Sequence, residues 1–250
     1  MNIQSNLPVS VLAENPSELV SNKYGFIPTT RIINIFESQG WHVVNAKALK
    51  PRTKDPLYVK HAVEFEHEIH SALSDTERFR ITVVNSHDAS SSFQFFTGLM
   101  RLVCSNGLFV GQSLPNYKVR HVGFTDAKVN EALVNTLEGA PIVASMITAM
   151  KDTDLNPDQR LSFYLKAMRL VDSPVKSIQG LEYAKRQADR DQDLWTVFNR
   201  VQEYIMRGGL TYLSEYKGKP SFRRTRGINA ISKQIKINRV LWDLAMSYVR

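Results

Sequence analysis

The sequence predicts an α+β fold, with an antiparallel sheet in the N-terminal half and helices in the C-terminal half. Between residues 58 and 124, apolar and polar side chains alternate, which is typical of strands with one buried face. From Thr125 onward, apolar residues recur every three or four positions, as in amphipathic helices. Because strands come first and helices follow, this order indicates an α+β fold and disfavours repeated βαβ units.

Residues 1–57 are expected to form a polar N-terminal segment with one helix. Pro28-Thr29-Thr30 is a typical helix start, and apolar residues then recur at helical spacing until Gly40 ends the pattern. The segment 41–44 favours the start of a strand. The stretch 50–56 contains two prolines and is typical of a turn or loop.

The sheet is expected to occupy residues 58–124, with strands at 59–70, 78–85, 92–96 and 117–124. In the first strand, His61 falls on the apolar face. A histidine in that position is more often a hydrogen-bonded core residue than a metal ligand. Glu64, Glu66 and Glu68 fall on the opposite face, which is expected to be exposed to solvent.

Two interpretations remain open for residues 96–110. Asn106-Gly107 lies between two apolar runs, which is the strongest short-range signal for a β-hairpin, and we favour a hairpin there. The alternative is a short helix from Phe96 to Ser105, with Gly107 near its C-terminus.

Residues 125–250 are expected to be helical and basic, and to form one continuous domain with the sheet. The first helical stretch is interrupted near Gly139 and Pro141, because proline disrupts a helix interior. The next begins at Asn156-Pro157, a cap followed by proline at the first helical position. Its inward residues are expected to be Leu161, Leu165, Met168 and Val171.

Two further helices are expected before the C-terminus. One is capped by Asp191 or Asp193, and Gly208-Gly209 ends it. The other runs from about Ile228 to Tyr248. Its apolar positions change face near Lys236, which indicates either a kink or burial on two sides.

The positive charge is concentrated in the C-terminal part of the chain. The net charge is +8, and residues 1–150 carry 13 basic and 13 acidic side chains, whereas residues 151–250 carry 19 and 11. An excess of one sign attracts anions over about a Debye length, roughly 8–10 Å at physiological salt. The distribution therefore favours a polyanionic partner for the C-terminal part.

One basic stretch dominates this excess, because no acidic residue interrupts it. Its cations are Lys217, Lys219, Arg223, Arg224, Arg226, Lys233, Lys236 and Arg239. Cations that neutralise phosphates release condensed counterions, which drives binding without regard to base sequence. Three aromatic residues, Tyr212, Tyr216 and Phe222, are interleaved with this stretch and could stack on unpaired bases. The alternative is a solvated surface whose aromatic residues pack inward.

A second polar motif follows the expected strand at 78–85. It comprises Asn85, Ser86, His87 and Asp88, with Arg101 as an additional cation. Side chains of this kind build turns by bonding to nearby backbone groups. The same groups could instead form an anion site, in which hydroxyls and backbone N–H groups hold a phosphate. A Ser-His-Asp catalytic triad is not supported, because neighbouring strand residues point to opposite sides.

Several signals are absent from the sequence. There is no Walker A loop, GxGxxG, CxxC or HExxH motif, so no cofactor or metal site is expected. Cys104 is the single cysteine and cannot form an internal disulfide. No apolar run approaches the roughly 20 residues of a membrane span, and the N-terminus lacks a signal peptide. We therefore expect a cytoplasmic protein that does not bind membranes.

The chain resembles the phage/plasmid-like protein family, a domain-of-unknown-function family of mobile elements. The resemblance covers the chain from about residue 24 to the end. It rests on residues 85–88, 98–108, 120–121, 195–203, 208–209, 236–238 and 241–242, together with His61. Ala89 departs from the family pattern, which usually continues Asp-Gly-Ser at this point. The resemblance implies a phage or plasmid origin and brings no catalytic residues.

The leading hypothesis is a non-enzymatic nucleic-acid-binding protein that prefers single-stranded DNA. By analogy with annealing proteins it would act in recombination, in the cytoplasm of the host cell, as a homo-oligomer. One alternative is an inhibitor of a host defence system that binds a host protein. Another is a metal-dependent nuclease built on Glu64, Glu66 and Glu68 with His87 and Asp88. Sequence preference and the choice between DNA and RNA stay open.

Overall fold

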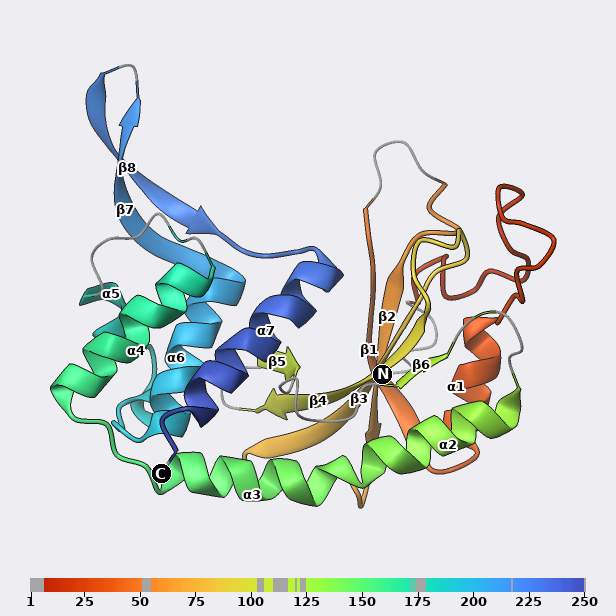
Figure 1. Cartoon of the computed structure of the whole chain (residues 1–250), viewed down its shortest axis with the longest axis horizontal. Coiled ribbons are helices and arrows are strands. Elements are labelled where there is room, and N and C mark those ends of the chain that lie inside the picture. The colour runs from red at the N-terminus through yellow and green to blue at the C-terminus, as the bar shows by residue number, and fades with distance from the viewer. Residues whose placement is uncertain are drawn as a thin grey trace. The chain divides into compact units, whose positions relative to one another are not determined.

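The computed structural model describes residues 7–50, 55–102, 106–109, 117–119, 121, 125–171, 173, 179–216 and 218–249. The fold is α+β, as the sequence predicts, with an N-terminal antiparallel sheet followed by helices and a small second sheet (Figure 1). The chain forms two compact units. One contains residues 1–107 and 113–141, and the other contains residues 108–112 and 142–250.

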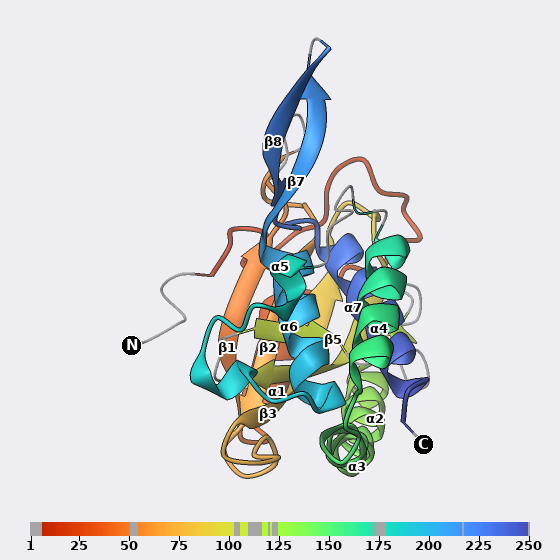
Figure 2. The same ribbon diagram turned by 90° about the vertical axis from the view of Figure 1, so that its left-hand side faces the viewer.

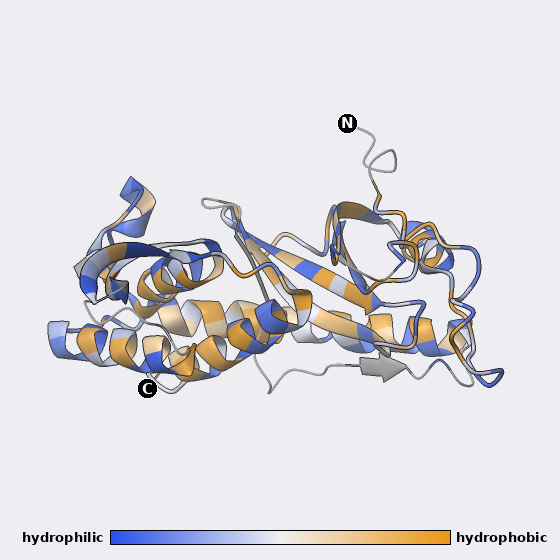
Figure 3. Ribbon diagram, turned by 90° about the horizontal axis from the view of Figure 1, so that it is seen from above, coloured by the Kyte–Doolittle hydropathy of each residue, from blue (hydrophilic) through white to orange (hydrophobic). Residues whose placement is uncertain are grey.

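The first unit is built on a sheet whose strands follow one another in chain order. β1 (Trp41–Ala48), β2 (His61–His67), β3 (Glu77–Asn85) and β4 (Phe93–Arg101) pair antiparallel with their neighbours. β5 (Asn106–Phe109) follows β4 in the sheet, and β6 (Tyr117–Val119) also pairs with β4. Hydrophobic and hydrophilic residues are interspersed along the strands (Figure 3), and β2, β3 and β4 are buried along most of their length.

Two helices cover apolar residues of this sheet. α1 (Thr29–Glu37) packs against β1 and buries Ile32, Ile33 and Phe36. The Phe36 ring lies 4.2 Å from that of Phe65 on β2, between ring centroids. α2 (Asp126–Leu137) packs against β4. The helix predicted before Gly40 is therefore confirmed, and it supplies part of the core.

The segment from residue 92 to residue 110 differs from the prediction in detail. β4 continues to Arg101, so the helix from Phe96 to Ser105 is wrong. β4 and β5 are neighbours, as in the favoured hairpin, but Asn106-Gly107 begins β5 and does not form the turn. Residues 103–105, which connect the two strands, lie outside the described residues. β4 is buried along most of its length. Its packing outweighed the local Asn-Gly signal, because tertiary contacts override short-range preferences.

Of the three glutamates predicted to face solvent, Glu68 is exposed, Glu66 is half-buried and Glu64 is buried. Glu64 is only 7% exposed, and Glu68 lies in a turn after β2 ends. Arg80 on the neighbouring β3 donates to Glu64 at 2.9 Å and to Glu66 at 2.5 Å. This cross-strand pairing explains how two carboxylates can be buried, because opposite charge compensates the lost hydration.

The second unit contains mainly helices and a hairpin. Its elements are α4 (Pro157–Leu170), α5 (Gln179–Glu182), η2 (Gln187–Asp189), α6 (Leu194–Arg207), β7 (Gly208–Tyr216), β8 (Lys219–Arg226) and α7 (Ile231–Met246). α3 (Gly139–Lys151) begins in the first unit and continues into this one. Asn156 and Gln159 form a reciprocal capping box at the start of α4, and Asp193 caps α6. Both predicted caps are present, and of the two candidates for α6 it is Asp193, not Asp191, that forms the cap.

The inward face of α4 was predicted only in part, since Met168 is buried as expected. Leu161 and Leu165 are 42% and 40% exposed, whereas Phe163 and Tyr164 are fully buried. The aromatic side chains carry more apolar area than leucine, so burying them gains more free energy. α7 is one helix and buries positions on two sides, among them Ile237 and Asn238, as its sequence pattern indicated.

One helical stretch has the length and composition of a membrane span. Residues Asp126–Lys151, which include α2 and α3, form a stretch of 26 residues. Its most apolar 18-residue window has a mean hydropathy of 1.3, and 33% of that window is buried. The expectation that no such run exists is thereby corrected. Length and composition alone do not separate a spanning helix from a core helix of this kind.

Two histidines are fully buried, His61 at the start of β2 and His87 just after the end of β3. The His61 ring lies 2.8 Å from Thr29 Oγ1 and 3.0 Å from the Val59 carbonyl, so His61 is the hydrogen-bonded core residue that was predicted. The His87 ring lies 5.1 Å from the His61 ring. Burial lowers the pKa of His61 to about 3 and that of His87 to about 4. The Ser10 backbone and the charge of Asp88 raise the pKa of His87, and the charge of His121 lowers it, but burial outweighs all three. The Ser10 backbone lies near the His87 ring without forming a hydrogen bond to it.

These pKa values predict a loss of stability in mild acid. The folded state keeps both rings neutral, whereas the unfolded chain binds protons below its ordinary histidine pKa of about 6.5. Stability is therefore complete above that pH and falls as the pH decreases toward the folded values. The linkage relation gives about 2 kcal/mol lost per histidine between about pH 7.5 and 5.

Urea unfolding at these two pH values checks this prediction. His87→Phe keeps a ring of similar size and should lose less stability on acidification than the unmodified chain. His42→Phe removes an exposed histidine from β1 and serves as the matched control. Equal acid sensitivity of His87→Phe and the unmodified chain would contradict the assignment.

Candidate nucleic-acid interface

The basic stretch forms a two-stranded hairpin that sequence analysis did not predict. Tyr216 pairs with Lys219, and Gly218 between them has φ +73°, a region that glycine adopts without strain. The residue pattern contained a signal, because an X-Gly dipeptide lies between two runs of strand-forming residues.

The hairpin begins directly at the end of α6, without a loop. Gly208 ends the helix with φ +74°, and a Cβ at this position would lie 2.5 Å from the Thr225 carbonyl oxygen. The Ile228 N–H donates to the Met206 carbonyl oxygen at 2.9 Å as the chain leaves the hairpin. Both strands are thereby fixed to the last turn of α6. Figures 1 and 2 show the hairpin projecting beyond helices α4, α6 and α7.

The two faces of the hairpin differ in burial. Tyr212 lies opposite Arg223, and Leu213 lies opposite Phe222, so each pair shares one face. The face of Tyr212 is partly covered toward the root of the hairpin. The opposite face is open, with Leu213 64% and Phe222 79% exposed.

The structure distributes the predicted cations over β8 and α7. Lys219, Arg223, Arg224, Arg226, Lys233 and Lys236 are exposed, and Arg239 is partly buried. Lys217 and the side chain of Tyr216 lie outside the described residues. Four of the cations, Arg223, Arg224, Arg226 and Lys233, line one cavity, whereas Lys219, Lys236 and Arg239 do not.

This cavity is open, has a volume of about 650 Å³ and lies at the root of the hairpin. Helices α4 and α6 contribute apolar side chains such as Met168 and Ile205, and the strands contribute Tyr212 and the arginines. The complete lining is Met168, Val171, Ser173, Tyr204, Ile205, Leu210, Tyr212, Arg223, Arg224, Thr225, Arg226, Ile228 and Lys233.

Three of these cations are not paired with carboxylates of the residues described. Within the described part of the chain, Arg224, Arg226 and Lys233 form no ion pair with an acidic side chain. The acidic residue Glu203 of α6 instead forms ion pairs with Lys185, Arg186 and Arg207. Arg186 donates two hydrogen bonds to it, at 2.8 and 2.9 Å.

The Glu203 carboxylate stays charged inside the protein. Burial by itself would raise its pKa, but Arg186 and Lys185 more than offset this and hold the pKa below its usual range. Lys185 also lies 4.1 Å above the ring of Tyr204, a residue of the cavity lining. Arg186 and Lys185 therefore neutralise Glu203, and Lys185 also holds the Tyr204 ring in the wall of the cavity.

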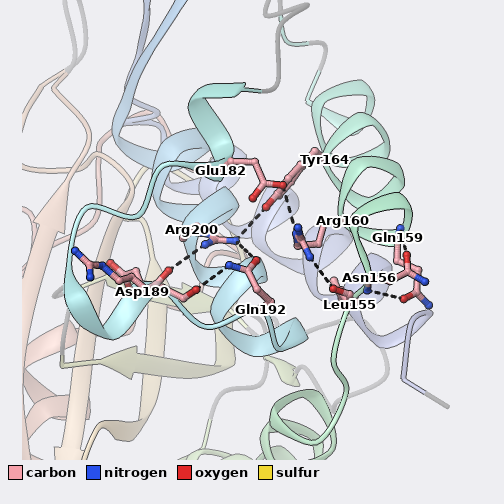
Figure 4. A network of polar contacts seen from close by, with 10 residues as sticks. Leu155, Asn156, Gln159, Arg160, Tyr164, Glu182, Asp189, Gln192 and Arg200 are labelled. Atoms are coloured by element: carbon pink, nitrogen blue, oxygen red, sulfur yellow. Dashed lines mark hydrogen bonds and ion pairs between the residues drawn. The ribbon is translucent and has the colours of Figure 1, made fainter.

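A second polar network joins α4 to α6, as Figure 4 shows. Arg200 of α6 is 4% exposed and donates to the Tyr164 hydroxyl and the Asp189 carbonyl oxygen, both at 3.1 Å. It also donates to Gln192 at 3.3 Å. Because Tyr164 lies on α4, this contact holds the two helices that supply the apolar wall.

The predicted anion site forms a closed turn. Asn85, Ser86 and His87 are fully buried, and Asn85 donates to the Thr29 hydroxyl at 3.0 Å. The Ser91 N–H donates to Ser86 Oγ at 2.9 Å, and the Ser90 N–H donates to Asp88 at 3.0 Å. Arg101 is not brought here, since it ends β4 opposite Glu77, whereas this turn precedes the start of β4.

The same turn contains a strained residue. Ala89 has φ +58°, and among the described residues it is the one non-glycine residue with positive φ. Side chains with a Cβ pay about 1–2 kcal/mol in this region. The family that this chain resembles usually has glycine at this position. Glycine removes the strain, but it lowers the free energy of unfolding by about 0.4–1 kcal/mol because the unfolded chain is more flexible.

We therefore expect Ala89→Gly to stabilise the protein by up to about 1 kcal/mol, because relief of strain exceeds the entropic loss. Ala72→Gly, whose site lacks positive φ, is the matched control and should destabilise. Chemical denaturation measures both changes. Destabilisation by Ala89→Gly equal to that of the control would contradict this account of the turn.

Comparison with known proteins identifies the family. The model of the family described as "Domain of unknown function (DUF932)" matches residues 16–242. The chain belongs to this family. Two relatives from Escherichia coli (strain K12), the UPF0380 proteins YafZ and YfjQ, are each 31% identical over 243 residues. Each alignment covers 94% of this chain and 86% of the relative. No solved structure matches the chain.

Family membership confirms the resemblance that the sequence motifs indicated. It also agrees with the coverage of that resemblance, which extends over nearly the whole chain. The family description and the names of the two relatives state no activity. Any function must therefore be argued from the residues and geometry of this chain.

Proposed function

We propose that this protein binds nucleic acid through the hairpin β7–β8 and the cavity at its root. The observation that carries the proposal is the arrangement of Arg223, Arg224, Arg226 and Lys233 around one open cavity. Phosphates would be the ligands of these cations, since arginine offers paired donors that fit phosphate oxygens. Each neutralised phosphate releases counterions, which favours binding at low salt.

The shape of the hairpin supports the same proposal. A two-stranded ribbon that projects from a protein can follow a nucleic-acid backbone or enter a groove. The cations of β8 lie along such a ribbon, and Lys233 at the start of α7 extends the positive surface. As the resemblance implies a mobile-element origin, we place the activity in recombination, with single-stranded DNA as the favoured ligand and annealing by a homo-oligomer in the host cytoplasm as its role.

A second candidate function is binding of a host protein. Leu213 and Phe222 form an exposed apolar pair on the open face of the hairpin, and exposed aromatic residues of this kind often mark protein interfaces. Retention of one host protein on the immobilised chain after nuclease treatment would favour this alternative. The nuclease hypothesis is less favoured, because Arg80 already occupies Glu64 and Glu66.

The electrostatic proposal predicts a steep dependence of affinity on salt. With about four phosphates neutralised, affinity for a single strand should fall about fiftyfold between about 50 and 200 mM salt. Fluorescence anisotropy with a labelled oligothymidylate measures this dependence. An affinity that hardly changes over this range would contradict the proposal.

Charge reversal locates the binding surface. The double variant Arg224→Glu/Arg226→Glu should lower affinity at least about tenfold, because it removes two phosphate contacts and adds repulsion. Lys23→Glu/Lys50→Glu carries the same change of net charge on exposed residues of the first unit and serves as the matched control. Equal loss in both variants would show that net charge matters and that the hairpin does not.

A further inference from the structure

The cavity at the hairpin root combines two chemical surfaces. Its inner wall is apolar, with Met168, Ile205 and Leu210 each less than 10% exposed. Its outer residues are cationic, and Arg224, Arg226 and Lys233 are exposed. Its volume of about 650 Å³ is within the roughly 300–1,000 Å³ typical of small-molecule sites. This combination fits a ligand that has a flat, weakly polar part and an anionic part.

We infer that the cavity binds one unpaired base of the nucleic-acid strand, while the arginines bind the flanking phosphates. The inference rests on the proposed function and extends it, because it makes the protein selective for single strands. In a duplex each base is paired and stacked inside the helix, and extracting one costs a few kcal/mol. Bases of a single strand carry no such pairing cost and can enter directly.

Tyr212 is the residue that stacks on the bound base. It lies on the same hairpin face as Arg223, its cross-strand partner, so a base on its ring is next to a cation for the phosphate. Tyr204 also lines the cavity, but Lys185 covers its ring at 4.1 Å. Stacking on an aromatic ring tolerates any base, so the site selects for strandedness and not for base identity.

The neighbouring residue Leu213 provides a matched control. It points to the opposite face of the hairpin, does not line the cavity and is 64% exposed. Tyr212→Leu removes the aromatic ring without changing charge, and Leu213→Thr alters a side chain of the other face, also without changing charge. Ile228→Trp adds bulk to a partly exposed residue of the lining and should fill the space that the base requires.

The experiment measures the affinity of each variant for a short oligothymidylate and for the same strand paired with oligoadenylate. Tyr212→Leu and Ile228→Trp should bind the single strand about tenfold more weakly, with less than a threefold change for the duplex. Leu213→Thr should match the unmodified chain on both. Thymidine monophosphate should compete with the oligothymidylate on the unmodified chain and should compete less well on Ile228→Trp. Thermal unfolding confirms that each variant is folded.

The outcomes separate the inference from the function on which it rests. If Arg224→Glu/Arg226→Glu loses binding to both ligands while Tyr212→Leu and Ile228→Trp keep full single-strand affinity, the base site is overturned and nucleic-acid binding stands. A loss in Leu213→Thr as large as that in Tyr212→Leu would move stacking to the open face and would likewise overturn the cavity assignment. If the arginine variant binds as the unmodified chain does, both proposals fail.

Discussion

The geometry at Gly208 determines where the positive charge of this protein is presented. Its positive φ turns the chain from α6 straight into β7, and the Thr225 carbonyl oxygen leaves no room for a Cβ. α6 is buried along residues 194–206, so it is the best-anchored helix of its unit. A hairpin fixed to the end of such a helix inherits its orientation. The cations of β8 are therefore placed by the most buried element, although they are themselves exposed.

The unit also separates its charges. Glu203 and Asp189 both accept hydrogen bonds from Arg186, so acidic side chains of α6 and η2 are neutralised on their own side. No such partner among the described residues reaches Arg224 or Arg226. The net charge of +8 is consequently not spread evenly. It is concentrated on β8 and the start of α7, around the root of the hairpin, which favours contact with a polyanion.

Local signals allowed much of the fold to be predicted. Capping residues such as Asn156 and Asp193 fixed helix starts, and the period-two pattern located the strands. Errors arose where partners distant in sequence decided the outcome. Arg80 buries Glu64 from another strand, and Tyr164 of α4 turns inward, where Arg200 of α6 donates to its hydroxyl.

The candidate site shows the same division between local and distant information. The basic residues were evident from composition, whereas the cavity was not, because its lining comes from α4, α6, the hairpin and α7. Met168 and Arg226 are far apart in the chain and share no periodic pattern. The sequence therefore predicted the charge of this surface but not its shape.

The exposed outer part of the hairpin gives the final step of the argument. An isolated two-stranded ribbon is only marginally stable in water, and here the burial is concentrated at the root, where Leu210 is 4% exposed. Cross-strand pairs such as Leu213 with Phe222 add about 0.2–1 kcal/mol each. The root therefore holds its shape without a ligand, which is what a preformed base site requires. In the outer part of the hairpin, repulsion between the cations lowers stability, and this repulsion falls when phosphates neutralise them.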